Sequence, residues 1–304
     1  MNIILLGKDG QVGWELQRAL QPLGKVFALS RHSNANGLCG DLSNYDTMFS
    51  LFTKISPDIV VNAAAYTAVD KAESEQAEAD IVNHLAVDNL AKLCKSHQAL
   101  LVHYSTDYVF DGSGDIPWSE KDVSCPINYY GKSKRAGELA LEESGVKFIN
   151  FRTSWVYSTY GSNFIKTMLN LATDKTQLSI ISDQVGSPTG ASLIADVTAQ
   201  VIRYYNLQNS IRCQELHGHY HLAPTGFCSW FEYANFIFDN AKELGKVLAV
   251  EEVSAITTEQ YPTPAKRPHN SRLNTQKLQT QFDLYLPNWQ QGVIHVLKEL
   301  IHGK

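Results

Sequence analysis

The chain has 304 residues, of which 44% are hydrophobic and 19% are charged, and its formal net charge is -5. This is the composition of an ordinary soluble globular protein, and the negative balance argues against a general nucleic-acid surface. The five cysteines form no Cys-x-x-Cys pattern, which indicates free thiols in a reducing compartment. No apolar run approaches the ~20 residues of a membrane span, and no basic region precedes an apolar signal segment. We therefore expect a cytoplasmic protein without a membrane partner.

The first unit of the chain is predicted to be a strand, a glycine turn and a helix. Residues 2–6 form a nearly all-apolar run, which is typical of a strand buried on both faces of a parallel sheet. Gly7, Gly10 and Gly13 follow with the spacing G-x-x-G-x-x-G, and residues 14–20 have the pattern of an amphipathic helix. Such glycines let the backbone turn tightly and approach a pyrophosphate at the helix N-terminus. We interpret the motif as a dinucleotide-binding turn; the alternative is a purely structural turn.

The end of the second expected strand, residues 26–31, bears on the choice of cofactor. In NAD-preferring sites an acidic residue often ends this strand and holds the ribose 2′-hydroxyl, whereas here the strand ends in Arg31. An arginine at this point favours the 2′-phosphate of NADP; the alternative is a solvated loop arginine. Further on, Ser43 is predicted to be the N-cap of a helix that continues to about Lys54.

Strands and helices continue to alternate over about the first 150 residues. The next expected strand, residues 57–62, is followed by the small residues 63–65, against which a cofactor could lie closely. A helix is expected over residues 77–96 and a strand over residues 100–106. This alternation predicts an α/β fold with a doubly wound, Rossmann-like parallel sheet and helices on both faces. Thr106 then lies at the carboxyl edge of the sheet, where such folds bind ligands.

Tyr130 and Lys134 lie four residues apart in a segment expected to be helical, so their side chains share one face. A free phenol has a pKa of about 10 and rarely transfers a proton at neutral pH. A neighbouring ammonium group stabilises the phenolate and lowers that pKa. The pair therefore predicts a tyrosine that gives a proton to a developing alkoxide; the alternative is a surface tyrosine packed along a lysine. We expect the pair to meet the glycine turn and Thr106 at the same edge of the sheet.

The regular alternation loosens after residue 152, which predicts a smaller C-terminal α/β part. We assign residues 1–152, together with residues 185–225, to the dinucleotide-binding part. Residues 153–184 and 226–304 are assigned to the second part.

Two segments of the second half carry side chains with other chemistry. His217, His219 and His221 alternate and would share one face of a strand. Three histidines can bind a metal, but a half-buried strand face is the favoured interpretation. Arg267 and Arg272 lie on a proline-stiffened loop and could clamp a diphosphate; the alternative is a solvated basic loop.

Six motifs together resemble those of the extended short-chain dehydrogenase/reductases and, more closely, those of the dTDP-4-dehydrorhamnose reductases. In chain order they are GKDGQVG (7–13), NAAAYTAVDKAE (62–73), STDYVFDG (105–112), YGKSK (130–134), RTSWVY (152–157) and RPHNSRL (267–273). They cover nearly the whole chain in the order of the family, so the resemblance is specific.

The resemblance implies a reaction and the residues that carry it. NADPH, with NADH left open, would reduce the 4-keto group of dTDP-6-deoxy-L-lyxo-4-hexulose to give dTDP-L-rhamnose. Tyr130 would donate the proton, and Lys134 would lower the pKa of Tyr130 and hydrogen-bond the nicotinamide ribose. Thr106 would hydrogen-bond the ketone oxygen. The product would enter dTDP-rhamnose biosynthesis for lipopolysaccharide or O-antigen.

Together with the glycine turn and Arg31, the resemblance also indicates which residues line the two ligands. The expected cofactor contacts are Gly7, Gly10, Gln11, Val12, Gly13, Arg31, Asp41, Leu42, Ala63, Ala64, Ala65, Tyr130 and Lys134. The expected nucleotide-sugar contacts are Thr67, Val69, Thr106, Asp107, Trp155, Arg267 and Arg272.

Two positions refine the resemblance. Related reductases that also epimerise the sugar have a cysteine directly after the catalytic hydroxyl residue, whereas here Asp107 follows Thr106, so we predict reduction without epimerisation. Some family members bind Mg²⁺ at a dimer contact through acidic side chains. Glu15 and Asp196 match two of those positions, but Ser192 stands where a glutamate is expected. The metal and a homodimer are therefore left open.

Two other functions remain as alternatives. The first is a nucleotide-sugar epimerase or dehydratase of the same superfamily, although a dehydratase would have an acidic pair beside Thr106, and Asp107 alone is not that pair. The second is an NADP-binding regulatory subunit of another enzyme. Such a subunit would be expected to lose active-site residues, whereas Thr106, Tyr130 and Lys134 are all present.

Overall fold

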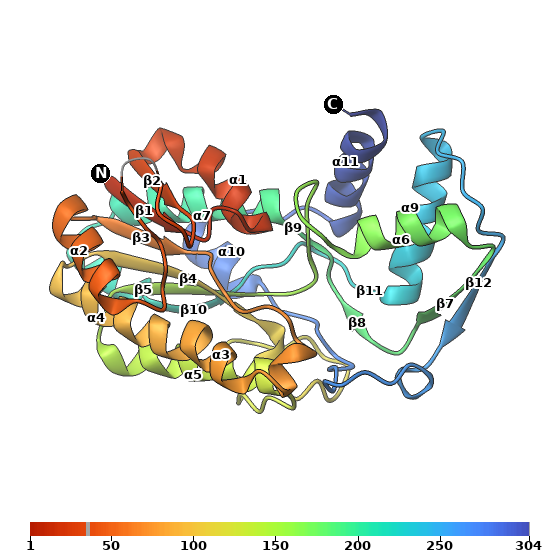
Figure 1. Cartoon of the computed structure of the whole chain (residues 1–304), viewed down its shortest axis with the longest axis horizontal. Helices are drawn as coiled ribbons and strands as arrows, with labels where there is room; N and C mark the ends of the chain where they lie inside the picture. Colours follow the sequence, from red (N-terminus) through yellow and green to blue (C-terminus); the bar gives the residue numbers. More distant parts are fainter. Residues whose placement is uncertain (35–36, 304) are drawn as a thin grey trace.

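The computed structural model of the chain describes residues 1–34 and 37–303. Figure 1 shows two parts, a sheet covered by helices and a smaller group of helices and short strands that contains the C-terminus. Among the described residues, no helix is both long and apolar enough to cross a membrane.

The larger part is built on a six-stranded parallel sheet, counted over the described residues, with the order β10-β5-β4-β3-β1-β2. Its strands are β1 (Asn2–Leu6), β2 (Lys25–Leu29), β3 (Ile59–Asn62), β4 (Leu100–Thr106), β5 (Phe148–Thr153) and β10 (Gly218–His221). The apolar run at residues 3–6 is fully buried, because helices cover both faces of the sheet. The predicted doubly wound fold is thus confirmed.

Successive residues of β1 serve two different cores, because side chains alternate across a strand. Ile3 and Leu5 belong to the core formed with one set of helices, and Ile4 and Leu6 belong to the core on the opposite face. The first face carries α1 (Gln11–Ala19), α7 (Ala191–Asn206) and α10 (Gln276–Phe282). The second face carries α2 (Tyr45–Ile55), α4 (Ala86–Ser96) and α5 (Tyr129–Ser144). Short connecting elements are η1 (Gln21–Leu23), η2 (Lys71–Glu73), η4 (Asp107–Val109) and α8 (Ser210–Glu215).

Two details differ from the sequence-based expectation. The N-cap of α2 is Asn44, whose side chain accepts a hydrogen bond from the backbone N–H of Thr47. The expected cap, Ser43, instead donates its hydroxyl to Asp41 Oδ1 at 2.7 Å. The single helix expected over residues 77–96 is divided into α3 (Gln76–Asp80), a π-helical turn η3 (Ile81–Leu85) and α4. π-Helical turns occur frequently at functional sites, and this one lies against the cleft described below.

The smaller part has its own core. Its elements are β6 (Val156–Tyr157), α6 (Phe164–Asp174), β7 (Gln177–Ile181), β8 (Val185–Gly186), β9 (Thr189–Gly190), β11 (Cys228–Ser229), α9 (Trp230–Glu243), β12 (Glu252–Ile256), η5 (Thr258–Gln260) and α11 (Trp289–His302). Apolar side chains of α6, α9 and α11 fill this core, and β7 pairs with β12 in parallel. The predicted smaller α/β part is confirmed. Leu278 and Phe282 of α10, however, pack under the sheet of the larger part.

Candidate active site

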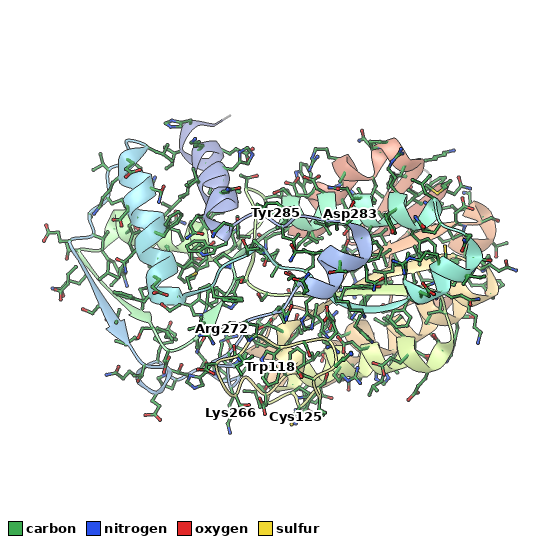
Figure 2. All side chains as sticks on the ribbon, turned by 180° about the vertical axis from the view of Figure 1, so that it is seen from behind. Trp118, Cys125, Lys266, Arg272, Asp283 and Tyr285 are labelled. Carbon is green, nitrogen blue, oxygen red and sulfur yellow. The ribbon has the colours of Figure 1, made fainter. Side chains whose placement is uncertain are left out.

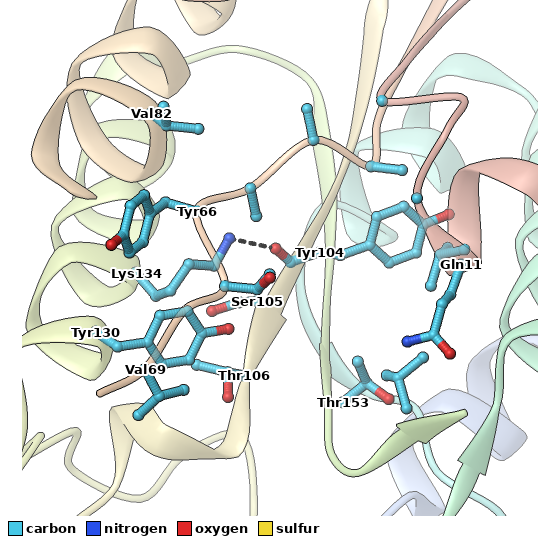
Figure 3. A pocket seen from close by; sticks show the side chains of 18 of the residues that line it. Gln11, Tyr66, Val69, Val82, Tyr104, Ser105, Thr106, Tyr130, Lys134 and Thr153 are labelled. Atoms are coloured by element: carbon cyan, nitrogen blue, oxygen red, sulfur yellow. Dashed lines mark hydrogen bonds between the residues drawn. The ribbon is translucent and has the colours of Figure 1, made fainter. Parts of the chain in front are cut away.

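An open cleft of about 990 Å³ lies at the carboxyl ends of the sheet strands. Most of the residues singled out from the sequence line it (Figure 3). They are Gly7, Gly10, Gln11, Val12, Arg31, Asp41, Leu42, Ala63, Ala64, Ala65, Thr67, Val69, Thr106, Asp107, Tyr130, Lys134 and Trp155. These residues come from all parts of the first 155 positions, so the fold gathers them at the edge where doubly wound sheets bind ligands.

The glycine turn between β1 and α1 lets its backbone approach neighbouring backbone segments closely. Gly7 has φ +78°, and a Cβ on it would lie 2.6 Å from the backbone nitrogen of Ala64. A Cβ on Gly13 would lie 2.0 Å from the carbonyl oxygen of Gly7, so Gly13 packs α1 against the turn, and the structure does not place it on the cleft wall. Gly10 precedes α1 and carries no side chain to cover the first N–H groups of the helix. These features fit the pyrophosphate of a dinucleotide.

Arg31 is one of the residues that line the cleft. Its side chain is 75% exposed, and its Nε lies 3.8 Å from Asp41 Oδ1. A loose ion pair at the surface contributes little free energy, so the guanidinium is available to a phosphate that enters the cleft. Its contact with a 2′-phosphate stays a prediction.

Replacement of Arg31 by alanine is expected to weaken NADPH binding far more than NADH binding. Loss of a charge-assisted bond to a phosphate should raise the Kd of NADPH roughly ten- to a hundredfold, whereas NADH has no group at that position. Titration of cofactor fluorescence would measure both constants. Arg203→Ala, an exposed arginine on α7, serves as the control. Equal weakening of the two cofactors would contradict the assigned role of Arg31.

Tyr130 is placed by the first turn of α5. The side chain of Asn128 caps this helix by accepting the N–H of Gly131 at 2.8 Å, and a Cβ on Gly131 would lie 2.2 Å from Tyr108 O. The helix can therefore approach the β4 loop closely, and the Tyr108 and Tyr130 rings meet edge to face at 5.8 Å. Burial and the charge of Asp107 raise the pKa of Tyr130, while the hydroxyl of Thr106 lowers it. At neutral pH, Tyr130 is therefore a protonated acid.

Lys134 lies one turn further along α5 and is buried. Its Nζ donates a hydrogen bond of 2.7 Å to the carbonyl oxygen of Tyr104 (Figure 3) and lies 3.3 Å from His103 Nε2. Burial lowers the pKa of Lys134 to about 8, although the charge of Glu138 acts in the opposite direction. The expected lowering of the Tyr130 pKa by Lys134 is not what this arrangement shows, because the ammonium group is directed at β4.

Thr106 and Asp107 form a hydrogen-bonded pair at the end of β4. Thr106 Oγ1 donates to Asp107 Oδ1 at 3.0 Å and accepts the N–H of Tyr108 at 3.2 Å. Burial raises the pKa of Asp107 to about 6, and its hydrogen bonds with Ser271 and Thr106 partly offset this. With its proton directed at Asp107, the Thr106 hydroxyl presents a lone pair that can accept a hydrogen bond from a neighbouring phenol.

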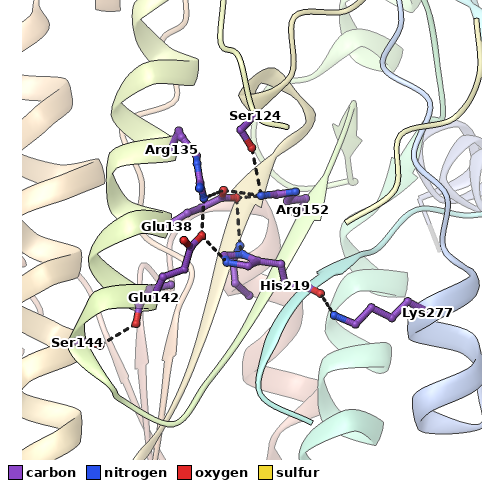
Figure 4. A network of polar contacts seen from close by, with 10 residues as sticks. Ser124, Arg135, Glu138, Glu142, Ser144, Arg152, His219 and Lys277 are labelled. Carbon is purple, nitrogen blue, oxygen red and sulfur yellow. Dashed lines mark hydrogen bonds and ion pairs between the residues drawn. The ribbon is translucent and has the colours of Figure 1, made fainter. Parts of the chain in front are cut away.

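An ion-pair network connects α5 with β5 and β10 (Figure 4). Arg152 of β5 makes two hydrogen bonds of 2.8 Å to Glu138, and the two side chains are 3% and 0% exposed. Arg135 also contacts Glu138 at 3.0 Å, and His219 of β10 contacts Glu142 at 3.0 Å. The network joins α5 to the sheet strands and thereby fixes the helix that carries Tyr130 and Lys134.

The structure does not bring Arg267 and Arg272 to the cleft, judged over the described residues. Arg267 Nη2 lies 2.6 Å from Asp70 Oδ2, and its Nη1 lies 3.5 Å from the Tyr108 hydroxyl. Arg272 bonds to Asn270 and lies beside Trp118 near the junction of the two parts (Figure 2). Arg267 is thus paired with Asp70 and contacts Tyr108, a residue of the cleft wall.

The residues considered for a metal do not gather around a vacant cation site. Arg18 lies 3.6 Å from Glu15 and 2.9 Å from Asp196, so one guanidinium neutralises both carboxylates. A divalent cation would need those oxygens itself, and the residues therefore do not fit Mg²⁺ in this arrangement.

The three alternating histidines also point to different partners. His217 contacts the Tyr205 hydroxyl on α7, whereas His219 contacts Glu142 on α5. Glu138, Glu142 and His219 are the one group of three such side chains, among the described residues, that could hold a metal. Because two arginines contact the same carboxylates, the group is an ion-pair network.

Several residues of the site were missed from the sequence. Asn83, in the π-helical turn, accepts the N–H of Tyr66 at 2.9 Å and donates to Ser133 on α5 at 3.0 Å, so it ties the 66–70 loop to the helix of Tyr130. Trp230 and Tyr108 line the cleft. Trp230 is the first residue of α9 and lies far in the sequence from any of the motifs, so no sequence pattern indicated it as a site residue. For Tyr108, the position directly after Thr106-Asp107 was the available clue.

A doubly wound sheet with a glycine turn at its carboxyl edge, and a Tyr-x-x-x-Lys helix beside that edge, defines the class of the extended short-chain dehydrogenase/reductases. Comparison with known proteins gives the family. The family model described as "RmlD substrate binding domain" matches residues 1–302. The chain belongs to this family, whose curated members include the dTDP-4-dehydrorhamnose reductases.

Two curated relatives and one solved structure illustrate the relationship. The chain is 51% identical to a dTDP-4-dehydrorhamnose reductase of Escherichia coli (strain K12) over 300 residues, which are 99% of this chain and 98% of the relative. It is 52% identical to the enzyme of the same name from Salmonella typhimurium, with the same coverage. The crystal structure of dTDP-4-dehydrorhamnose reductase from Bacillus anthracis in complex with NADP has a TM-score of 0.87 and 34% identity, and covers 98% of this chain and 99% of its own.

Proposed function

We propose that the chain is an NADPH-dependent oxidoreductase that reduces the 4-keto group of dTDP-6-deoxy-L-lyxo-4-hexulose to give dTDP-L-rhamnose, without epimerisation. The observation that carries the proposal is the arrangement of Thr106, Tyr130 and Lys134 in one cleft with the glycine turn. Full-length relatives bearing the name of this activity support the substrate. A related structure holds NADP, and Arg31, two residues after β2, supports the same cofactor.

The proposed roles follow from the geometry of the cleft. NADPH, when bound along the Gly7–Gly13 turn and Ala63–Ala65, supplies the hydride. Tyr130 is protonated at neutral pH and gives its phenolic proton to the oxygen of the reduced ketone. Thr106 lies beside Tyr130, and it would hydrogen-bond the ketone oxygen once its hydroxyl proton turns away from Asp107. Lys134 places a buried positive charge at the edge of the site, where negative charge develops.

The two parts of the chain have separate proposed tasks. Residues 1–152 and 185–225 would bind the dinucleotide, and residues 153–184 and 226–304 would hold the nucleotide-sugar. The sheet position of β10 supports the first assignment. The pairing of β8 with β11 and of β9 with β6 favours the smaller part for residues 185–190, and the packing of α10 under the sheet favours the larger part for that helix. Thr67, Val69 and Trp155 line the cleft and are the proposed sugar contacts.

The proposed surroundings of the enzyme rest on smaller observations. All five cysteines are free, which fits a reducing compartment, and we place the enzyme in the cytoplasm. The product would supply lipopolysaccharide or O-antigen synthesis. A homodimer is left open, and the position of Arg18 between Glu15 and Asp196 does not favour bound Mg²⁺.

The test is oxidation of NADPH by the purified chain in the presence of the freshly epimerised dTDP-4-ketosugar. We expect NADPH absorbance to fall and NMR of the product to show dTDP-L-rhamnose. Tight NADPH binding without oxidation would favour the alternative of a regulatory subunit. Release of an epimerised or dehydrated sugar without net NADPH consumption would favour the epimerase or dehydratase alternative.

The pH dependence of the reaction is expected to report on Lys134. Since burial lowers the pKa of Lys134 to about 8, its ammonium form is present below that pH and is lost as the pH rises above it. The kcat/KM should therefore be level below pH 8 and should fall about tenfold per pH unit above it. Lys134→Arg should move this alkaline limb to higher pH, because a guanidinium stays protonated. If the alkaline limb does not move in Lys134→Arg, the limb reports the titration of another group. Lys132→Arg, at an exposed lysine on α5, is the control.

A further inference from the structure

Two tryptophans form a stacked pair in the wall of the cleft. The rings of Trp155 and Trp230 lie 3.5 Å apart with an angle of 14° between their planes, and both residues line the cleft. Trp155 lies between β5 and β6, and Trp230 is the first residue of α9. Phe164 of α6 lies against Trp230 at 4.5 Å. The pair therefore joins the sheet edge to the core of the smaller part.

Trp155 has an unusual backbone conformation. Its φ is +48°, a region that a bulky residue adopts only where its surroundings fix it, and such residues gather at functional sites. Its carbonyl oxygen accepts the N–H of Thr189 at 3.2 Å. A Cβ on Gly186 would lie 2.8 Å from the indole, so the ring rests on the bare backbone of that glycine. The orientation of Trp155 is thus fixed from several sides.

Trp230 is held by contacts of its own. Ser229 caps α9 in a reciprocal pair with Glu232, and the indole N–H of Trp230 donates to Gln184 Oε1 at 3.2 Å. β11, which ends at Ser229, pairs with β8, and Cys228 of β11 lies opposite Gly186 of β8. The Trp155 indole rests on Gly186 of β8, and Trp230 directly follows β11. The pairing of these two strands therefore fixes the two indoles relative to each other.

We propose that Trp230 is a positioning residue for the sugar site. Stacked against Trp155, it holds that indole as a rigid wall for the hexose of the nucleotide-sugar; this inference rests on the function proposed above. The C–H groups of a deoxyhexose pack favourably on aromatic rings, and a ring fixed before binding loses less conformational entropy when the sugar arrives. The glycine and alanine turns that would hold the dinucleotide come from β1 and β3, so the pair affects the sugar and spares the cofactor.

The test compares Trp230→Ala with Trp230→Phe and wild type in the ketosugar assay. Trp230→Ala should raise the KM for the ketosugar about tenfold, equivalent to about 1.4 kcal/mol, while the Kd of NADPH changes less than about twofold. The far-ultraviolet circular dichroism couplet of the stacked indoles should disappear. Trp230→Phe should have a KM close to that of the wild type, because the phenylalanine ring can also stack against Trp155. Trp14→Ala removes a tryptophan stacked on Tyr160 at 4.4 Å, outside the cleft, and should leave KM and couplet unchanged.

Gly186→Ala gives a second measurement if Trp230→Ala does not fold. The added Cβ displaces the Trp155 ring without removing either indole, so the same rise in KM with a weaker couplet is expected. An unchanged ketosugar KM in a folded variant that has lost the couplet would overturn the inference alone. Absence of turnover by the wild-type chain would overturn the proposed function, and this inference with it.

Discussion

Tyr130→Phe is expected to abolish most of the reduction while NADPH still binds. The phenolic proton is the one that the reduced ketone receives, and the phenylalanine keeps the ring in its edge-to-face contact with Tyr108. Loss of a positioned general acid lowers rates by on the order of 10²–10⁴, and the effect should fall on kcat. Stopped-flow measurement of NADPH oxidation in a single turnover would separate the chemical step from binding.

The neighbouring Tyr129 provides a matched control for this variant. Its hydroxyl donates to Asp80 at 2.6 Å, and the residue is not among those that line the cleft in the described chain. Tyr129→Phe removes the same atom from the same turn of α5 and should keep nearly full activity. Turnover by Tyr130→Phe at the wild-type rate would remove Tyr130 as the acid and would assign the proton to another donor, such as Asp107.

The sequence allowed the fold to be predicted because its signals are local. Residues 2–6 are apolar without alternation, as a strand buried on both faces must be, and Gly7 permits a turn that a side chain would block. Tyr130 and Lys134 share a helix face by spacing alone. In each case the physical cause lies within a few residues of the pattern, so one sequence is enough to detect it.

The remaining parts of the site depend on contacts between distant segments. The guanidinium of Arg267 could bind a diphosphate, but in the structure it forms an ion pair with Asp70. No local sequence pattern connects these two positions. Lys134 was expected to act on Tyr130, yet its hydrogen bond goes to β4. Trp230 enters the cleft only because β11 pairs with β8. The partners of these side chains are determined by contacts between segments that are distant in the sequence.

Arg152→Met is expected to have the largest effect on stability, because it leaves the carboxylate of Glu138 buried without its main partner. Removal of one member of a buried ion pair costs about 3–5 kcal/mol of unfolding free energy. Arg135 also contacts Glu138 but replaces neither hydrogen bond of Arg152. Urea unfolding followed by circular dichroism would measure the loss. The double variant Glu138→Met with Arg152→Met should recover most of it, since no charge is then left uncompensated.

The pH dependence of this loss distinguishes the ion pair from simple packing. Burial alone raises the pKa of Glu138, but the hydrogen bonds and charge of Arg152 outweigh burial and bring the pKa to about 2. An unfolded glutamate titrates at about 4.3, so the ionised carboxylate stabilises the wild type fully above that pH, and this contribution is lost as the pH falls toward about 2. In Arg152→Met, burial then dominates and the carboxyl takes up its proton more readily in the folded state. As the pH is lowered, the difference in stability between the two proteins should therefore begin to shrink above about pH 4, where the variant's carboxyl is protonated, and should shrink further toward about pH 2, where the wild type loses its contribution. A defect of packing would leave the difference constant.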